Sequence, residues 1–397
     1  MQGHHAVLIT NQQEARALLN EIGADPLGLE YMIPKAVFRC IKLKGISCKA
    51  ANLLKQEMLS KGGEAAVARD TLNGEGFTDV LLMGNLKHYR LLTKKLRLQP
   101  FGLKELAGEI EFILKNLEPH LTTIKLSNNR EMELGSRTMI MGILNITPDS
   151  FSDGGRYFDV DLAVRHAMEM KEEGADIIDI GGASSRPNSI MASADEEIRR
   201  ILPVIERLKY EDIVISVDTF RAEVARVALE AGADIINDIG ALQLDPELVN
   251  VLSAYRAPAI LMHNRMQLNT GKPYQDFIAD IIAELRQSLE MAVKAGVNED
   301  QLIIDPGIGF VPTAAQNLLI IKRLAEFKSL GKPVLVGTSR KSFIGQTLNL
   351  EVHDRLEGSL ATVVMAIMNG ADIVRVHDVI ASRQLVQMTD ALMRENG

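Results

Sequence analysis

The alternation of hydrophobic and polar positions divides the chain into two differently patterned regions. Before residue 117, apolar residues recur at helical spacing in four segments: 11–22, 48–61, 85–97 and 103–116. The run Thr78–Met83 is typical of a strand. These elements predict a small α/β domain. The stretch 117–137, which contains Pro119, Gly135 and a polar tetrad, is typical of a linker, so we expect domains over residues 1–130 and 131–397.

The second region contains a repeated unit. Gly-Ala-Asp-Ile, beginning at Gly174, Gly232 and Gly370, follows an amphipathic helical stretch each time and opens a short apolar run. Glycine suits the residue after a helix, where φ is positive, and β-branched residues suit a strand that is buried on both faces. We expect the repeated aspartates Asp176, Asp234 and Asp372 to bind backbone amides at strand starts, a structural role.

Eight buried strands are predicted in this region. Five further apolar runs accompany the three repeats: Met139–Leu144, Ile213–Val217, Pro258–Met262, Leu302–Ile304 and Pro333–Val336. Eight strands that alternate with helices over about 260 residues are typical of a (β/α)8 TIM barrel. The predicted fold class is therefore a (β/α)8 barrel preceded by a small α/β domain. A doubly wound open sheet is the alternative, because periodicity alone does not demonstrate closure.

Composition narrows the class of protein. The 397 residues include two cysteines, Cys40 and Cys48, which is too few for a disulfide framework, and neither lies in a zinc-type cluster. No apolar run approaches a membrane span, and the N-terminus lacks a signal-peptide pattern. We expect a cytoplasmic protein. Residues 1–120 carry 16 basic and 13 acidic side chains, whereas the remainder carries 28 and 39, so a general nucleic-acid surface is disfavoured.

Polar residues stand at the predicted strand ends, and in a barrel the carboxyl ends of the strands carry the chemistry. One group suits the amide and amidine edges of a flat heterocycle: Asp218, Asn237, Asp305 and Lys341. A second group suits phosphate oxygens and a hard metal ion such as Mg²⁺: Asn145, Arg375, His377 and, nearby in sequence, Asp153. The sequence therefore predicts a ring pocket beside a phosphate pocket.

Two connecting segments, 146–156 and 181–189, are rich in glycine and serine and follow the first two strands. Such loops are able to close over a substrate and exclude water. Neither the P-loop motif nor a dinucleotide-binding glycine motif is present in the sequence.

Six motifs in this region resemble those of the dihydropteroate synthase family. They are Gly142-Ile-Leu-Asn-Ile-Thr-Pro-Asp-Ser-Phe-Ser-Asp-Gly-Gly155, Ser216-Val-Asp-Thr219, Asn237-Asp238, Asp305-Pro-Gly-Ile-Gly-Phe310, Ser339-Arg-Lys341 and Arg375-Val-His-Asp378. The resemblance covers residues 137–395. It implies a barrel enzyme of folate biosynthesis that joins 7,8-dihydropterin-6-ylmethyl diphosphate to 4-aminobenzoate and releases diphosphate.

The resemblance also implies a role for each matching residue. Asp218, Asn237, Asp305 and Lys341 would bind the pterin, with Met262 and Phe310 lining its pocket. Asn145 would hold Mg²⁺, and Arg375 and His377 the diphosphate. The aminobenzoate site would be formed by Phe151, Asp153, Ser185, Arg186, Pro187 and Ser342. The family further implies a homodimer and a target for sulfonamides.

The residue types agree with a dissociative reaction. The reacting methylene carries a good leaving group on an electron-rich ring, so C–O cleavage can precede attack and leave a pterin cation. Asp218 would stabilise this cation, while Mg²⁺, Arg375 and His377 would stabilise the departing diphosphate. No general base is needed to activate the arylamine, and no nucleophile with an adjacent base stands at the strand ends.

The sequence departs from the family pattern near the aminobenzoate site. Ala183 replaces the usual Glu, Ser185 the usual Thr and Asn188 the usual Gly, and Pro312 stands where Lys is typical. We expect these changes to affect the second substrate, and the response to sulfonamides, more than the first substrate.

Two other functions remain open at this point. A methyltetrahydrofolate-dependent methyltransferase on the same barrel would share the ring-binding residues but would not need Arg375 or His377. In a non-catalytic pterin-binding module, Asp153 and Arg186 would have no function. Residues 1–130 show no catalytic motif, and we expect a non-catalytic domain there.

Overall fold

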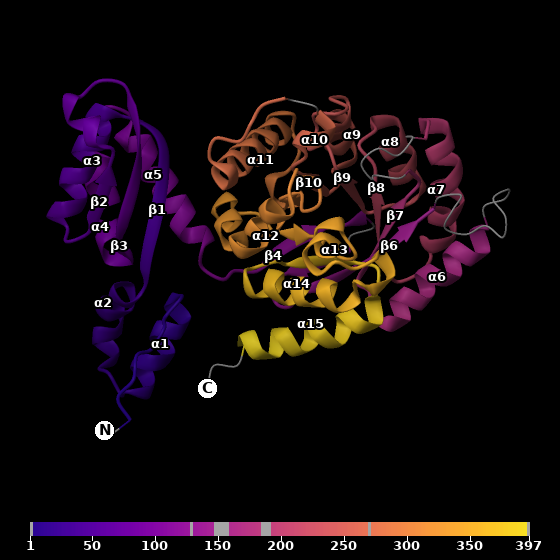
Figure 1. Cartoon of the computed structure of the whole chain (residues 1–397), viewed down its shortest axis with the longest axis horizontal. Coiled ribbons are helices and arrows are strands. Elements are labelled where there is room, and N and C mark those ends of the chain that lie inside the picture. The colour runs from indigo at the N-terminus through magenta and orange to yellow at the C-terminus, as the bar shows by residue number, and fades with distance from the viewer. Residues whose placement is uncertain (1–2, 128–129, 147–158, 184–191, 269–270, 395–397) are drawn as a thin grey trace. The chain divides into compact units, whose positions relative to one another are not determined.

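The structure, a computed structural model, describes residues 3–127, 130–146, 159–183, 192–268 and 271–394. It separates into two compact units, Met1–Pro119 and His120–Glu395 (Figure 1). This division falls before the expected boundary at residue 130, because the strands at 122–125 and 131–134 belong to the second unit and pack against the base of the barrel. No helix in the described ranges is long and apolar enough to cross a membrane.

The N-terminal unit is a three-stranded antiparallel sheet with helices. Along the chain its elements are α1 (Gln12–Glu21), α2 (Pro26–Ala36), β1 (Phe38–Ser47), α3 (Cys48–Ser60), β2 (Glu64–Val67), the 3₁₀-helix η1 (Arg69–Asn73), β3 (Phe77–Asn85), α4 (Leu86–Leu96) and α5 (Leu103–Asn116). The sheet has the order β1-β3-β2. The four predicted helices and the strand at 78–83 are confirmed. The pattern missed α2, which contains Pro34, and the half-exposed strands β1 and β2.

Residues 139–376 form the predicted eight-stranded parallel barrel. Its strands are β6 (Met139–Asn145), β7 (Ile177–Gly181), β8 (Val214–Asp218), β9 (Ile235–Asp238), β10 (Ala259–Met262), β11 (Leu302–Asp305), β12 (Leu335–Val336) and β13 (Ile373–Val376). They pair in the order β11-β10-β9-β8-β7-β6-β13-β12. A parallel bridge between Ile304 and Val334 joins the two ends of this order. The barrel is therefore closed, and the open-sheet alternative is wrong.

Helices follow the strands around the barrel (Figure 1). They are α6 (Val160–Glu173), α7 (Ala194–Leu208), α8 (Ala222–Ala231), α9 (Leu248–Tyr255), α10 (Arg265–Leu268), α11 (Phe277–Lys294), α12 (Ala314–Lys322), α13 (Ser342–Leu348), α14 (Leu356–Met368) and α15 (Val379–Arg394). The described part of this unit also contains the 3₁₀-helices η3 (Glu299–Gln301), η4 (Leu324–Leu330) and η5 (Val352–Asp354).

The three Gly-Ala-Asp repeats have one shared geometry. Gly174, Gly232 and Gly370 have φ values of 108°, 119° and 96°, the left-handed conformation that closes a helix. Each repeated aspartate accepts a backbone N–H from a neighbouring strand: Ile140 N to Asp176 (2.8 Å), Ile215 N to Asp234 (3.0 Å) and Val334 N to Asp372 (2.7 Å). The predicted structural role of these aspartates is confirmed.

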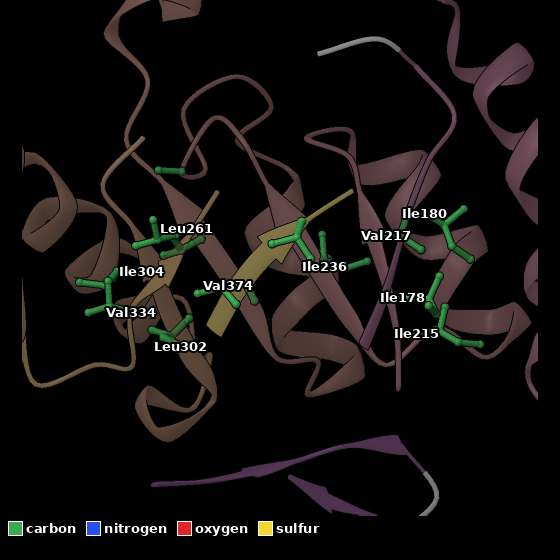
Figure 2. Close-up of a cluster of buried hydrophobic side chains, with 14 of the residues drawn as sticks. Ile178, Ile180, Ile215, Val217, Ile236, Leu261, Leu302, Ile304, Val334 and Val374 are labelled. Atoms are coloured by element: carbon green, nitrogen blue, oxygen red, sulfur yellow. The ribbon is translucent and has the colours of Figure 1, made fainter. Parts of the chain in front are cut away.

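Alternation along each strand separates an apolar outer face from a mixed inner face. Side chains such as Ile178, Val217, Ile236, Leu261 and Val374 belong to the large core between strands and helices (Figure 2). Their sequence neighbours point into the barrel. Near the strand starts these inner residues are apolar, including Ile177, Ile235, Ile303 and Ile373. Further along the strands the inner residues are polar: Asp179 in the middle of β7, and Asp218, Asn237, Asp305 and Arg375 at or next to the ends of their strands. The polar site therefore lies above an apolar inner layer.

A hairpin covers the lower end of the barrel. Strands β4 (Thr122–Lys125) and β5 (Glu131–Leu134) pair antiparallel, and Ile124, Met132 and Leu134 are buried in the same cluster as the lower inner layer. Gln301 holds the hairpin through two hydrogen bonds to the backbone of Lys125, at 2.9 and 2.8 Å. Two strands of the stretch expected to be a linker therefore contribute to the barrel core.

Candidate active site

An arginine between two carboxylates forms the centre of the candidate site. Arg375, on the last strand, donates from Nε to Asp179 Oδ2 (2.6 Å) and from Nη2 to Asp218 Oδ2 (2.9 Å). Asn237 Nδ2 donates to the same Asp179 oxygen at 3.1 Å. Four strands, β7, β8, β9 and β13, thus contribute to one hydrogen-bonded group. Three of these residues were predicted, and Asp179 was not.

The environment of Asp218 changes its acidity. Burial disfavours the charged form and raises the pKa of Asp218 to about 7, although the Arg375 guanidinium opposes this shift. The negative charges of Asp179, Glu197 and Asp238 add to the increase. A carboxyl group that titrates near neutrality, in contact with an arginine, is typical of functional sites.

Lys341 and Asp305 form a second pair of groups on this rim. Asp305 is buried and accepts the N–H of Gly307 at 2.7 Å, while Lys341 Nζ donates to the carbonyl of Ile308 and lies 5.1 Å from the centre of the Phe310 ring. Burial lowers the pKa of Lys341 to about 8 and raises the pKa of Asp305, and the attraction between the two charges opposes both shifts.

The two pairs of groups are close together. An added Cβ on Gly337 would lie 3.7 Å from Lys341 Nζ and 3.7 Å from Arg375 Cβ. Gly309 runs so close to the lysine that a Cβ there would lie 2.6 Å from Lys341 Cδ. The φ of Gly309 is 90°, so both its conformation and the contact require glycine.

An apolar wall adjoins these polar groups. Met262 and Phe310 are buried and cluster with Ile239, and Phe220 and Leu244 pack against them. Met262 and Phe310 were predicted to line a ring pocket, and the structure places them in one cluster. A flat ring bound there would have an apolar face and a polar edge.

The predicted phosphate residues lie on the same rim. Asn145 ends β6, and its Oδ1 would be 3.3 Å from a Cβ added to Gly181, which itself would lie 3.7 Å from Asp218 Cβ. His377 follows β13, two residues after Arg375, and its Nδ1 lies 3.1 Å from Ser339 Oγ. The structure therefore brings Asn145, His377 and Arg375 to the mouth that holds the ring group.

Arg340 connects two loops of this mouth. It adopts a left-handed conformation with φ of 57°, and its guanidinium pairs with Asp378, the residue after His377 (Nε to Oδ2, 2.9 Å). Its backbone N–H donates to Ser359 Oγ at 2.8 Å. This pairing holds the Lys341 loop against the His377 loop. Ser342 is exposed at the first position of α13.

Two polar residues at strand ends point away from the mouth. Asp238 accepts the N–H groups of Gly240 (2.7 Å) and Leu242 (2.6 Å) and so shapes the turn after β9. His263 contacts Glu284 of α11 at 2.9 Å between its Nε2 and Oε2. Alternation along each strand accounts for both, because Asn237 and Met262 occupy the inward positions.

Five predicted residues lie outside the described residues: Phe151, Asp153, Ser185, Arg186 and Pro187. The sequence pattern did not predict a role for Asp179. It is fully buried, two positions before the end of β7, and the signal was available in the alternation of Ile178 and Ile180 with Ile177 and Gly181. Its importance follows only from the partners that other strands bring to it.

The described residues contain no cluster of three or more histidine, cysteine or acidic side chains suited to a metal ion. Asn145 nevertheless offers an amide oxygen at the end of β6, where a Cβ added to Gly181 would lie 3.3 Å from it. Mg²⁺ commonly takes only one or two protein ligands and completes its shell with water and substrate phosphates. The donor set therefore fits a magnesium ion that is held mainly by a diphosphate.

Comparison with known proteins identifies relatives of the barrel. Residues 141–377 match the family described as pterin binding enzyme. A dihydropteroate synthase of Clostridium beijerinckii is 48% identical over 268 residues, which are 67% of this chain and 98% of that protein. A probable bifunctional folylpolyglutamate synthase/dihydropteroate synthase of Halobacterium salinarum is 40% identical over 391 residues, 96% of this chain but 46% of that protein. The second alignment also includes the N-terminal unit.

Solved structures show the same likeness. Dihydropteroate synthase from Clostridium difficile, determined in the presence of pteroic acid, is 47% identical, with a TM-score of 0.63 over 66% of this chain and 99% of that one. The enzyme from Xanthomonas albilineans, determined with 4-aminobenzoic acid, is 38% identical, with a TM-score of 0.65 over 69% of this chain and 99% of that one.

Proposed function

Because this chain belongs to the dihydropteroate synthase family of pterin-binding enzymes, which are transferases, we propose that its barrel catalyses the reaction of that family. It joins 7,8-dihydropterin-6-ylmethyl diphosphate to 4-aminobenzoate and forms 7,8-dihydropteroate and diphosphate. The observation that carries this proposal is the convergence, on one rim, of a ring-binding group with a phosphate-binding group. Arg375 lies between them, in contact with Asp218 and two residues before His377.

The ring-binding group suits a pterin. Asp218 and Asp305 are carboxylates that accept N–H bonds from the amidine and amide edges of the ring, and Asn237 offers an amide oxygen. Lys341 donates to a ring oxygen or nitrogen, and Met262 with Phe310 covers the apolar face. Because Asp218, Asn237 and Asp305 are held by strands, little conformational freedom is lost on binding.

The charges at the mouth suit a dissociative transfer. As the C–O bond breaks, positive charge develops on the pterin and negative charge on the leaving diphosphate. Asp218, when ionised, stabilises the first, and Arg375 and His377 stabilise the second. The arylamine then attacks the methylene through its own lone pair and loses a proton to water, so no side chain has to act as a general base.

We further propose a requirement for Mg²⁺ with Asn145 as its protein ligand. The ion would neutralise charge on the diphosphate oxygens when bound. Isothermal titration of the protein with Mg²⁺ and diphosphate, separately and together, tests this without turnover. Binding of diphosphate that is tighter with Mg²⁺ in the wild type but not in Asn145→Ala is the expected result.

The second substrate and sulfonamides are proposed to share one site. The structure of the Xanthomonas albilineans enzyme contains 4-aminobenzoic acid, and that of the Yersinia pestis enzyme a sulfonamide drug complex. Ser342 is exposed at the start of α13, directly after Lys341, where it can contact an arylamine that approaches the methylene. Competitive inhibition against 4-aminobenzoate is the expected behaviour of a sulfonamide.

The decisive assay measures diphosphate release from the purified protein with pterin diphosphate, 4-aminobenzoate and Mg²⁺. Release that depends on both organic substrates is expected. Transfer of a methyl group from methyltetrahydrofolate, without such release, would instead establish the methyltransferase alternative, which none of the relatives described above supports.

We propose that the protein is a homodimer and that its N-terminal unit is non-catalytic. The helices α14 and α15 pack together and leave large apolar side chains exposed: Met365, Met368, Ile380, Met388 and Leu392. Apolar side chains gathered on adjacent helices often mark a subunit interface. Sedimentation equilibrium at micromolar concentration tests the dimer.

A further inference from the structure

We infer that Asp179 is a positioning residue that orients Arg375 and Asn237 for the pterin ring. This inference rests on the proposed function. Asp179 lies in the interior of β7, one strand away from Asp218, and its side chain is fully buried. It therefore acts on a substrate only through the residues that it holds.

The carboxylate of Asp179 receives donors from three other strands. Its Oδ1 accepts from Ser216 Oγ of β8 at 2.6 Å, and its Oδ2 accepts from Asn237 Nδ2 of β9 and Arg375 Nε of β13. A buried charge with such partners fixes their geometry, because each would lose a short charge-assisted bond by turning away.

This arrangement has a consequence for Asn237. Because the Asn237 amide nitrogen is bound to Asp179, its Oδ1 points to the other side of the amide. An amide oxygen held in that direction accepts an N–H from the ring edge. Asp179 thus selects which end of the Asn237 amide the substrate meets.

A second consequence concerns Arg375. The guanidinium has two carboxylate partners, and Asp179 is the buried one, with a side-chain exposure of 0% against 7% for Asp218. When a pterin takes up the Asp218 carboxylate, Arg375 keeps a counter-ion in Asp179 and stays in place. Without that counter-ion, Arg375 would remain bound to Asp218 and compete with the ring.

The substitution Asp179→Asn tests this inference because it retains the shape of the side chain. The asparagine oxygen still accepts from Arg375 and Asn237, and its NH2 group donates to Ser216 Oγ, so we expect a folded protein. The charge alone is lost. We expect binding of 6-hydroxymethyl-7,8-dihydropterin to weaken ~10- to 100-fold, by analogy with the loss found when groups that orient metal-binding side chains are removed. Calorimetric titration measures this directly.

Ser216→Ala is the matched control. It removes one neutral donor to Asp179 while the carboxylate keeps its charge and Arg375. Binding should weaken by less than about fivefold. An equal loss in the two variants would mean that packing around Asp179 matters rather than its charge, and the inference would be wrong.

Two further readouts separate positioning from a structural role. In a double-mutant cycle, Asp179→Asn should add little to the loss of pterin binding caused by Arg375→Met, because the guanidinium that it orients is absent.

The acid limb of the kcat/KM profile of Asp179→Asn should also move to lower pH. The charged groups that face Asp218 are Arg375, Asp179, Glu197, Asp238 and Lys341. Loss of the Asp179 charge removes one of the repulsions that raise the pKa of Asp218. Additive losses, or an unmoved limb, would overturn the inference.

A measurement on the wild type keeps the test independent of folding. The Nε–H of Arg375 should exchange slowly with solvent, by NMR, in both the free and the pterin-bound enzyme. Rapid exchange in either state contradicts the inference. A wild type that binds pterin but releases no diphosphate would overturn the proposed function alone, whereas an active wild type matched by Asp179→Asn would overturn this inference alone.

Discussion

Arg375 Nη2 and Asp218 Oδ2 lie 2.9 Å apart at the carboxyl ends of β13 and β8, so the last strand of the barrel is bound to the third. The two residues came from different predicted groups, Asp218 for the ring and Arg375 for the diphosphate. The ring-binding group and the diphosphate-binding group therefore meet at this ion pair. A substrate whose ring and diphosphate are joined by one methylene fits such a boundary.

The pH dependence of kcat/KM should be bell-shaped and narrow. Asp218 must be ionised to stabilise the pterin cation, and its pKa is raised to about 7, so activity falls as pH decreases through that value. Lys341 must be protonated to donate to the ring, and its pKa is lowered to about 8, so activity falls as pH increases through that value. The groups interact, so the two apparent pKa values belong to the site as a whole. An acid limb near pH 4 would contradict the role of Asp218.

Lys341→Ala and Arg375→Ala should each reduce kcat/KM by several orders of magnitude while the protein stays folded. Each side chain is a charge at the rim that we propose to contact the ring or the diphosphate, and groups that stabilise a transition state in this way are worth ~10²–10³ in rate. Steady-state diphosphate release and circular dichroism measure the two properties. Normal turnover by either variant would remove that residue from the site.

Loss of Asp234 should cost more stability than loss of Asp176, although both occupy the same repeat position. Asp234 is fully buried and accepts two bonds of 2.7 Å from Arg130, whereas the pair of Asp176 with Arg137 is partly exposed. We expect Asp234→Ala to lower the free energy of unfolding by about 2–3 kcal/mol, because charge-assisted hydrogen bonds are lost inside the protein. Urea denaturation measures the difference. Equal losses would show that the burial of Asp234 is irrelevant.

Gly309→Ala should weaken pterin binding. The new methyl group would lie 2.6 Å from Lys341 Cδ, so the lysine must move, and φ of 90° adds backbone strain. Gly271→Ala is the matched control, because Gly271 also has a positive φ (60°) but a Cβ there meets nothing within 4 Å. Titration with 6-hydroxymethyl-7,8-dihydropterin should distinguish the two variants. Similar affinities would show that Lys341 tolerates displacement.

The strand ends of the barrel were predictable because a parallel strand combines an apolar run with a polar residue at its carboxyl end. This pattern located Asp218, Asn237, Asp305 and Arg375 in the sequence. It did not locate Asp179, because a polar residue inside an apolar run has no meaning until the shear of the barrel decides which residues of other strands it meets. Ser216, Asn237 and Arg375 are 37, 58 and 196 residues away in the chain.

The domain boundary was misplaced for a related reason. The polar stretch around Asn128 is typical of a linker, and the sequence pattern contains no sign that the short runs on either side of it pair with one another. Ile124, Met132 and Leu134 alternate with polar residues, as they should in a half-buried hairpin. Only the apolar layer at the lower end of the barrel explains why these three side chains are buried.

Two truncations should therefore behave differently. A chain that begins at His120 retains the hairpin and the complete core of the second unit, so it should fold and retain diphosphate release. A chain that begins at Gly135 loses Ile124, Met132 and Leu134 and exposes the lower layer of the barrel. Burial of each such side chain stabilises a protein by ~1.5–3 kcal/mol, so the total approaches the ~5–15 kcal/mol that holds a typical domain together.

The longer chain should melt cooperatively and the shorter one should be unfolded or aggregated, as measured by circular dichroism and light scattering. Loss of turnover in a folded His120 truncate would instead give the N-terminal unit a part in the reaction.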